Sequence, residues 1–271
     1  MKNQPIISII TVCFNSEKHI EDTIKSVLSQ KYNNLQYIII DGGSKDKTMN
    51  IINKYKKEIS TIISEPDKGI SDAFNKGIQQ AKGDLVGIVN SDDILLPESL
   101  LAIATSYQKG EYDIYRGNSI IWNPISNKKY REYPSLKFST TPIFVNVAHE
   151  STFVTLNAYK KFGTYDIDLH YTMDLDFFIR AYKLGAKFKH VDHDIVQFRL
   201  GGATSTSMLK KRKDYIKMAY NNHASKLHAN LYFLGMLLID LGKRTLDLFG
   251  HEKTITEAIQ SFSHVEPKKE N

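Results

Sequence analysis

The chain has 271 residues, 41% of them hydrophobic and 24% charged, which is the composition of a globular protein and excludes a disordered or fibrous one. Its single cysteine, Cys13, excludes a disulfide framework and fits a reducing cytoplasm. The net charge of +6 is a mild basic excess, and aromatic residues are not interleaved with the basic ones, so we expect no nucleic-acid partner.

Strands and helices are predicted to alternate through the first hundred residues. Apolar runs rich in β-branched residues predict strands over 6–13, 35–40, 61–63 and 85–89. Apolar positions three and four residues apart predict a helix after each of the first three strands, and Pro97 opens another after the fourth. This alternation predicts a mostly parallel sheet with helices on both faces.

The remainder of the chain has a less regular pattern and ends in helices. The predicted elements are strands over 112–122, 129–133 and 152–156, a helix over 174–184, strands over 187–191 and 195–199, and helices from about 207 to 262. The N-terminal apolar run lacks the cleavage site of a signal peptide, and the later run from Leu231 to Leu241 is too short to cross a bilayer. We therefore expect a cytoplasmic protein, soluble or peripheral on the inner face of the cytoplasmic membrane.

Polar residues follow each of the four predicted parallel strands. Ligands of open parallel sheets bind beyond the carboxyl ends of the strands, so these segments are expected to converge on one rim. The four segments are 11–15, 41–44, 65–69 and 90–93. The chain contains neither G-x-G-x-x-G after the first strand nor a P-loop motif, which disfavours the common dinucleotide and P-loop sites.

Two adjacent carboxylates, Asp92 and Asp93, end the fourth predicted strand. Like charges this close raise each other's pKa, and a divalent cation such as Mg²⁺ or Mn²⁺ relieves the repulsion. Taken alone, the pair could equally cap the helix that starts near Pro97.

The combination of these segments resembles a family 2 glycosyltransferase. Four motifs carry the resemblance in the expected order: Thr11-Val12-Cys13-Phe14-Asn15, Asp41-Gly42-Gly43-Ser44-Lys45-Asp46-Lys47-Thr48, Glu65-Pro66-Asp67-Lys68-Gly69-Ile70 and Asn90-Ser91-Asp92-Asp93. The resemblance implies an α/β protein of GT-A fold over residues 1–205. Its donor half would span about 1–110 and its acceptor half about 111–205, with a C-terminal helical extension over 206–271.

The resemblance also implies roles in binding a nucleotide-sugar donor. Thr11 and Asn15 would line the nucleotide pocket, and Asp41 would accept a hydrogen bond from the nucleobase, namely from the N3–H of uracil. Lys68 would lie near the diphosphate, where a cation is favourable.

The same resemblance implies a metal site at the end of the fourth strand. Asp93 would be the principal ligand of Mn²⁺ or Mg²⁺, and Asp92 would approach the ribose or the metal. Asn90 departs from the family pattern, since many relatives carry an aspartate there, and this weakens any claim of a three-carboxylate site.

The second half offers a catalytic base. Asp174 resembles the aspartate of the family's E-D segment, although Met173 stands where glutamate often occurs. A sugar hydroxyl is a poor nucleophile until a positioned carboxylate takes its proton, which is the role expected of Asp174. Asp176 is the competing candidate, and helix N-capping is the alternative for both. His149 would lie near the sugar or acceptor, or be structural.

A last segment of the resemblance concerns the end of the predicted GT-A region. Arg199, or the backbone of Gly201 and Gly202, would contact the diphosphate, and a plain glycine hinge is the alternative. In the helical tail, Leu227 to Leu241 carry apolar residues on nearly every side. They favour burial in a helical subdomain or a homo-oligomer contact, and docking on a membrane surface with the basic run 210–213 is the alternative.

The resemblance implies an inverting, metal-dependent hexosyl- or N-acetylhexosaminyltransferase. Its donor would be a nucleotide diphosphate sugar, UDP-linked, and its acceptor a glycan or lipid-linked glycan of surface polysaccharide biosynthesis. Two alternatives remain open on the sequence: a sugar-phosphate nucleotidyltransferase, and a non-catalytic scaffold that binds sugar nucleotides.

Overall fold

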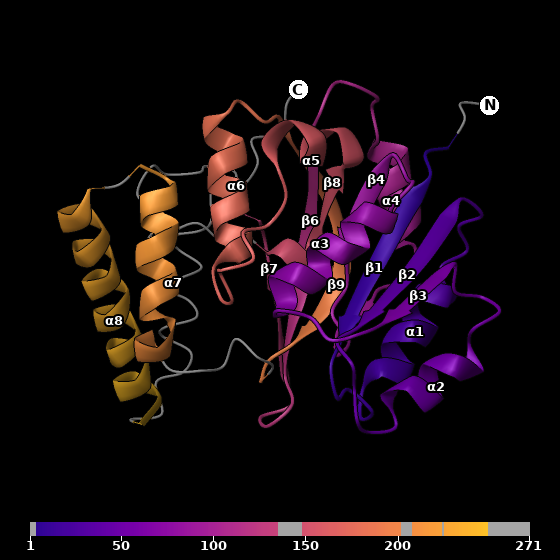
Figure 1. The fold of residues 1–271 in the computed structure, drawn as a ribbon, viewed down its shortest axis with the longest axis horizontal. Helices are drawn as coiled ribbons and strands as arrows, with labels where there is room; N and C mark the ends of the chain where they lie inside the picture. The colour runs from indigo at the N-terminus through magenta and orange to yellow at the C-terminus, as the bar shows by residue number, and fades with distance from the viewer. Residues whose placement is uncertain (1–3, 135–147, 202–207, 224, 249–271) are drawn as a thin grey trace.

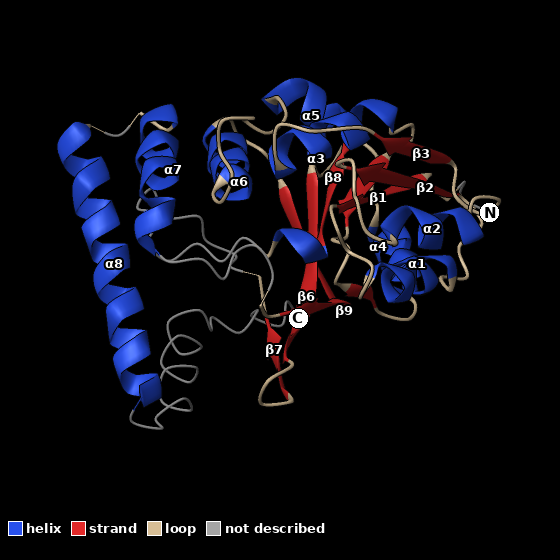
Figure 2. Cartoon of the chain, turned by 60° about the horizontal axis from the view of Figure 1, so that its bottom comes forward, coloured by secondary structure: helices blue, strands red, loops and turns tan. Residues whose placement is uncertain are grey.

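The computed structural model describes residues 4–134, 148–201, 208–223 and 225–248. Over these residues the strands form one sheet in the order β3-β2-β1-β4-β8-β6-β9-β5, and β7 pairs with β6 at the side. Helices cover both faces of the sheet, with α3 and α5 on one side and α1, α2 and α4 on the other (Figure 2).

The donor half is the alternating, parallel structure that the sequence predicts. Its strands pair in parallel throughout, because each connection passes through a helix on a face of the sheet. All seven residues of β1 are buried, as expected of a parallel strand covered on both faces. The elements are β1 (Ile7–Cys13), α1 (Ile20–Leu28), β2 (Leu35–Asp41), α2 (Thr48–Lys54), β3 (Thr61–Ser64), α3 (Ile70–Gln80), β4 (Leu85–Ile88) and α4 (Ser99–Ser106).

The acceptor half is mixed. Strand β8 runs antiparallel to both β4 and β6, whereas β6 and β9 are parallel. The elements are β5 (Ile94–Leu95), β6 (Ile114–Asn123), β7 (Lys128–Glu132), the short 3-10 helix η2 (His149–Ser151), β8 (Thr152–Thr155), α5 (Leu156–Phe162), α6 (Met173–Lys183) and β9 (Phe188–Arg199). The two strands predicted over 187–199 are therefore one long strand.

Helix α5 was not predicted from the sequence. The sequence pattern predicted a strand over residues 152–156 and no helix directly after it. Thr155 supplies the missing signal, because its Oγ1 accepts a hydrogen bond from the backbone N of Ala158 and caps the helix. Its capping role depends on β8 ending at that residue.

The core consists of two apolar clusters, one on each face of the sheet. Alternate residues of β1 supply both, with Ile10 and Val12 in one cluster and Ile9 and Cys13 in the other. Helices α3, α5 and α6 cover the first cluster and α1, α2 and α4 cover the second. This sandwich fixes the rim at which the carboxyl ends of the donor strands meet.

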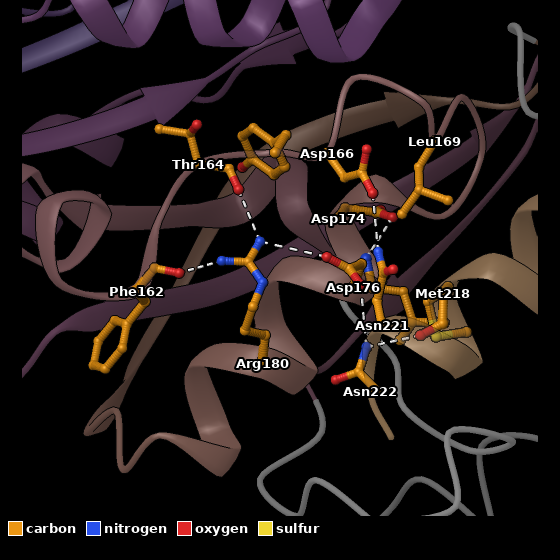
Figure 3. A network of polar contacts seen from close by, with 12 residues as sticks. Phe162, Thr164, Asp166, Leu169, Asp174, Asp176, Arg180, Met218, Asn221 and Asn222 are labelled. Atoms are coloured by element: carbon orange, nitrogen blue, oxygen red, sulfur yellow. Dashed lines mark hydrogen bonds and ion pairs between the residues drawn. The ribbon is translucent and has the colours of Figure 1, made fainter. Parts of the chain in front are cut away.

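Helix α7 (Met208–Asn221) is joined to the acceptor half by polar contacts (Figures 1 and 3). Asp214, which is buried, accepts hydrogen bonds from the backbone N–H groups of His170 (2.5 Å) and Tyr171 (2.6 Å). Asn222, just beyond the helix, donates its amide to Asp176 at 3.1 Å. The helix thus holds the segment that leads into α6.

Helix α8 (Lys226–Leu248) packs on the side of α7 that faces away from the sheet (Figure 1). Ala229 and Phe233 are buried, whereas a row of leucines stays exposed. That row is Leu227, Leu231, Leu234, Leu238 and Leu241. Within the described part of the chain the row is therefore not covered by the protein's own core, and the predicted helix beyond Leu248 lies outside the described residues.

Among the residues described, no helix has both the length and the apolar character that a membrane span needs.

We expect Asp214→Ala to lower the free energy of unfolding by about 1–3 kcal/mol, because two N–H groups lose their shared acceptor. Denaturant titration of the wild type, of Asp214→Ala and of a control variant measures the free energy of unfolding. The control is Asp168→Ala, whose carboxylate pairs with Lys217 of α7 at 2.6 Å but is 74% exposed, so its loss should cost at most about 1 kcal/mol. Equal losses in the two variants would show that α7 is not anchored through Asp214.

Candidate active site

A cavity of about 780 Å³ opens at the carboxyl ends of the donor strands, between the two halves. Loops that follow β1, β3 and β4 form its donor side, and η2, the start of α6 and the end of β9 form the other side. Its polar and aromatic lining includes Phe14, Asn15, Asp46, Asp67, Asn90, Asp92, His149, Glu150, His170, Tyr171, Asp174 and Arg199. Of the four segments predicted to converge on one rim, 11–15, 65–69 and 90–93 contribute residues to the cavity lining, whereas 41–44 does not.

Asn15 and Thr11, both predicted to line the nucleotide pocket, occupy different places. Asn15 lines the cavity, and its backbone N and side-chain Oδ1 bond to Ser44 Oγ and Lys45 N, each at 2.8 Å. Thr11 is fully buried within β1, with its Oγ1 3.1 Å from the hydroxyl of Tyr37. The predicted pocket contact of Thr11 is therefore not available in this structure, because β1 turns that side chain into the core.

Asp41 is placed inside the protein rather than in the cavity. It is fully buried, and its carboxylate accepts hydrogen bonds from Gly43 N (3.2 Å), Ser44 N (3.1 Å), the Ser44 hydroxyl and the Ser64 hydroxyl (2.7 Å). These bonds shape the loop after β2. Because both oxygens are occupied and shielded, the contact with a nucleobase predicted for Asp41 does not fit this geometry.

Lys68 also lies outside the cavity lining. Its side chain is exposed, and its backbone N donates to Asp72 Oδ2 at 3.0 Å near the start of α3. The neighbouring residues Asp67 and Gly69 line the cavity instead. The predicted approach of Lys68 to a diphosphate thus finds no support in this arrangement.

The two adjacent aspartates differ in environment. Asp93 is fully buried, and its two oxygens accept hydrogen bonds from Arg199 N (3.1 Å) and the Asn90 amide (3.2 Å). Burial, followed by the charges of Asp92 and Glu150, raises the pKa of Asp93 well above its usual range. Asp92 lies on the cavity wall, and burial raises its pKa as well.

Asn90 and Asp92, which both line the cavity, carry side-chain oxygens of the kind that hold a divalent cation. The described residues hold no cluster of three His, Cys, Asp or Glu side chains that could cage a metal. However, Asn90 Oδ1 is buried and has no hydrogen-bond partner within the described chain, and Asp92 lies two residues away on the same wall. Mg²⁺ is commonly held by one or two side chains together with phosphate oxygens. Of the two predicted ligands, Asp92 lines the cavity and Asp93 does not.

Asp174 and Asp176, the two candidate bases, are separated by the start of α6. Asp174 lines the cavity, and its Oδ1 accepts a hydrogen bond from Leu175 N at 2.7 Å. Asp176 is buried on the other side, where it accepts from Asn222 and contacts Arg180 at 3.4 Å (Figure 3). Of the two, only Asp174 lines this cavity.

His149 lies beside Asp174. Its Nδ1 is 3.3 Å from Asp174 Oδ2 and 3.3 Å from Glu150 Oε2. Burial alone lowers the pKa of His149, but the hydrogen bond to Asp174 and the charges of Glu150 and Asp174 outweigh burial and raise it to about 9. The imidazole is therefore charged at neutral pH, and its positive charge lies next to the carboxylate of Asp174.

The chain matches Glycosyl transferase family 2 over residues 8–185. It belongs to this family. A chondroitin synthase of Pasteurella multocida is 28% identical over 193 residues, which are 69% of this chain and 20% of that protein. Among solved structures, S. aureus TarS in complex with UDP-GlcNAc has a TM-score of 0.65 at 16% identity, covering 89% of this chain and 72% of that one.

A second solved structure is similar in fold to this family 2 glycosyltransferase. The mannosyltransferase PcManGT from Pyrobaculum calidifontis, in complex with GDP-Man and Mn²⁺, has a TM-score of 0.64 at 13% identity, covering 96% of this chain and 85% of that one. At such identities the likeness establishes the fold, which is GT-A as predicted from the sequence.

Several cavity residues of this glycosyltransferase were not assigned a role from its sequence. Phe14 is 61% exposed on the cavity wall, and Asp67, His170 and Tyr171 line it as well. Phe14 and Asp67 stand inside motifs that carried the resemblance, so their position at strand ends was the available signal. Arg199 does line the cavity as predicted, with its guanidinium 4.7 Å from the Trp122 ring.

Proposed function

We propose that this family 2 glycosyltransferase transfers one sugar from a UDP-linked donor to a hydroxyl of a glycan or lipid-linked glycan, with inversion at the anomeric carbon. One observation carries the proposal. A single cavity is lined both by the carboxylate of Asp174, with the charged His149 beside it, and by the side chains of Asn90 and Asp92.

Asp174 acts as the general base. Its Oδ1 is engaged with Leu175 N, and its Oδ2 lies near His149, so the side chain is fixed on the cavity wall. The carboxylate takes the proton of the acceptor hydroxyl as the oxygen bonds to the anomeric carbon and the bond to the diphosphate breaks. The transition state is oxocarbenium-like, and a single displacement inverts the configuration.

Asp92 and Asn90 would hold Mn²⁺ or Mg²⁺ against the diphosphate of the donor. When bound, the cation offsets the charge that develops on the leaving group. Asp93 would support these ligands indirectly, because its carboxylate accepts hydrogen bonds from the Asn90 amide and the Arg199 backbone and so fixes their positions. The Mn²⁺ found with GDP-Man in the mannosyltransferase and the UDP-GlcNAc found in TarS support a nucleotide-sugar donor of this kind.

The likeness to a chondroitin synthase supports polysaccharide assembly as the setting. A hexose or N-acetylhexosamine is the sugar class that we propose for the donor. The exposed leucine row of α8 supports a peripheral contact with the inner face of the cytoplasmic membrane, where a lipid-linked acceptor would be presented. A homo-oligomer contact through the same row is the alternative.

A thermal-shift panel tests the donor class. The melting temperature is measured with UDP, GDP, CDP, TDP and CMP, each in Mn²⁺ and in EDTA. We expect UDP to raise it only when metal is present, because a ligand that binds the folded state alone stabilises that state. No shift with any nucleotide would favour the scaffold reading. Release of pyrophosphate from a nucleoside triphosphate and a sugar phosphate would establish the nucleotidyltransferase instead.

A further inference from the structure

Gly42, directly after Asp41, leaves a space that another side chain fills. Its backbone N donates to Cys13 O at 2.9 Å, which holds the glycine against the end of β1. A Cβ added at residue 42 would lie 2.4 Å from Asp67 Oδ2 and 3.4 Å from Phe14 Cδ2. The Asp67 carboxylate therefore occupies the place into which a side chain at residue 42 would project.

Asp67 is held at one oxygen and open at the other. Its Oδ1 accepts a hydrogen bond from Gly69 N at 2.9 Å, which fixes the loop between β3 and α3. Its Oδ2, the atom that faces Gly42, has no hydrogen bond within the described residues, and Asp67 lines the cavity. One carboxylate oxygen is thus positioned to accept a hydrogen bond from a ligand.

Phe14 supplies a flat apolar surface next to this oxygen. Phe14 as a residue is 61% exposed and lines the cavity, and the side chains of Phe14 and Asp67 both approach Gly42. An exposed aromatic ring can stack on any planar heterocycle, whatever polar groups the heterocycle carries. A fixed hydrogen-bond acceptor beside the ring then favours those heterocycles that have an N–H group at the facing edge.

We propose that Asp67, and not Asp41, reads the nucleobase of the donor, with Phe14 as the stacking surface. This inference rests on the proposed function. Uracil presents an N3–H that Asp67 Oδ2 can accept, whereas cytosine presents a lone pair at N3 that a carboxylate repels. Asp41 cannot make this choice, since its oxygens are occupied by the loop that it shapes.

The test compares two nucleotides of equal size. The affinities of the full-length protein for UDP and CDP are measured by calorimetry in Mn²⁺. We expect the wild type to prefer UDP, and Asp67→Asn to lower the UDP-to-CDP affinity ratio roughly 10–100-fold, because an amide can donate to N3 of cytosine and accept from its amino group.

Gly42→Ala tests the same contact without altering the carboxylate. The added Cβ must displace the Asp67 side chain, which can rotate away, and Gly42 is not among the glycines with positive φ, so alanine fits the backbone. We expect this variant to weaken UDP binding more than CDP binding. The control is Asp46→Asn, at another cavity carboxylate, whose oxygens accept from Thr48 N (2.9 Å) and Glu17 N (3.1 Å).

The outcomes separate the two proposals. If the wild type binds UDP but Asp67→Asn keeps the wild-type UDP-to-CDP ratio, the nucleobase role of Asp67 is overturned and the proposed function stands. Equal affinity of the wild type for UDP and CDP also overturns it. If the wild type binds none of the nucleoside diphosphates, the proposed function itself fails, and the assignment of Asp67 with it.

Discussion

Asp174→Asn is expected to lower turnover roughly 10²–10⁴-fold while the affinity for the nucleotide donor stays at the wild-type value. The amide keeps the size of the side chain and can still accept from Leu175 N, but it cannot take a proton from the acceptor hydroxyl. The residues proposed to bind the donor, among them Asn90 and Asp92, stand at other positions on the cavity wall. Calorimetry with UDP and a coupled assay of UDP release from the sugar donor measure the two quantities separately.

Asp176→Asn is the matched control, because it changes the same group two residues further along α6. Asp176 is buried between α6 and α7, where Asn222 and Arg180 surround it (Figure 3). Its substitution should lower the melting temperature and leave the turnover of the folded protein close to wild type. Full activity of Asp174→Asn, or a larger loss in Asp176→Asn, would move the general base away from Asp174.

Asp92→Asn is expected to remove the dependence of donor binding on metal. In the wild type, UDP should bind roughly 100-fold more tightly in Mn²⁺ than in EDTA, because a bound cation would offset the negative charge of the diphosphate. The variant leaves two neutral amides, at residues 90 and 92, where a hard cation prefers a carboxylate. Its affinity for UDP should therefore be the same in Mn²⁺ and in EDTA.

Asp93→Asn tests whether Asp93 is itself the metal ligand or only supports the neighbouring residues proposed to bind the metal. Asp93 faces Arg199 N and the Asn90 amide rather than the cavity, and an asparagine there would set one amide N–H group against another. We expect a lower melting temperature with the metal dependence of UDP binding retained. The reverse pattern, with metal dependence lost only in Asp93→Asn, would return the principal ligand role to Asp93.

The donor half and its rim could be predicted from the sequence alone. Apolar runs predict strands β1 to β4, and apolar positions at helical spacing predict helices such as α1 and α3. Both patterns involve only residues that are close together in the sequence. Parallel pairing follows from the alternation, and parallel strands bring their carboxyl ends to one edge. The position of Asp174 at the start of a helix could also be predicted from nearby residues in the sequence.

The tertiary structure alone decided which polar side chains face the cavity. Asp41, Thr11 and Asp93 stand in the same motifs as Asn15, Asp67 and Asp92, yet hydrogen bonds to Ser64, Tyr37 and Arg199 draw the first three into the interior. Those partners lie 23, 26 and 106 residues away in the chain. A motif fixes the residue type and the strand end, but the choice between core and cavity depends on partners that only the folded chain brings near. The charged His149 beside Asp174 and the anchoring of α7 through Asp214 arise in the same way.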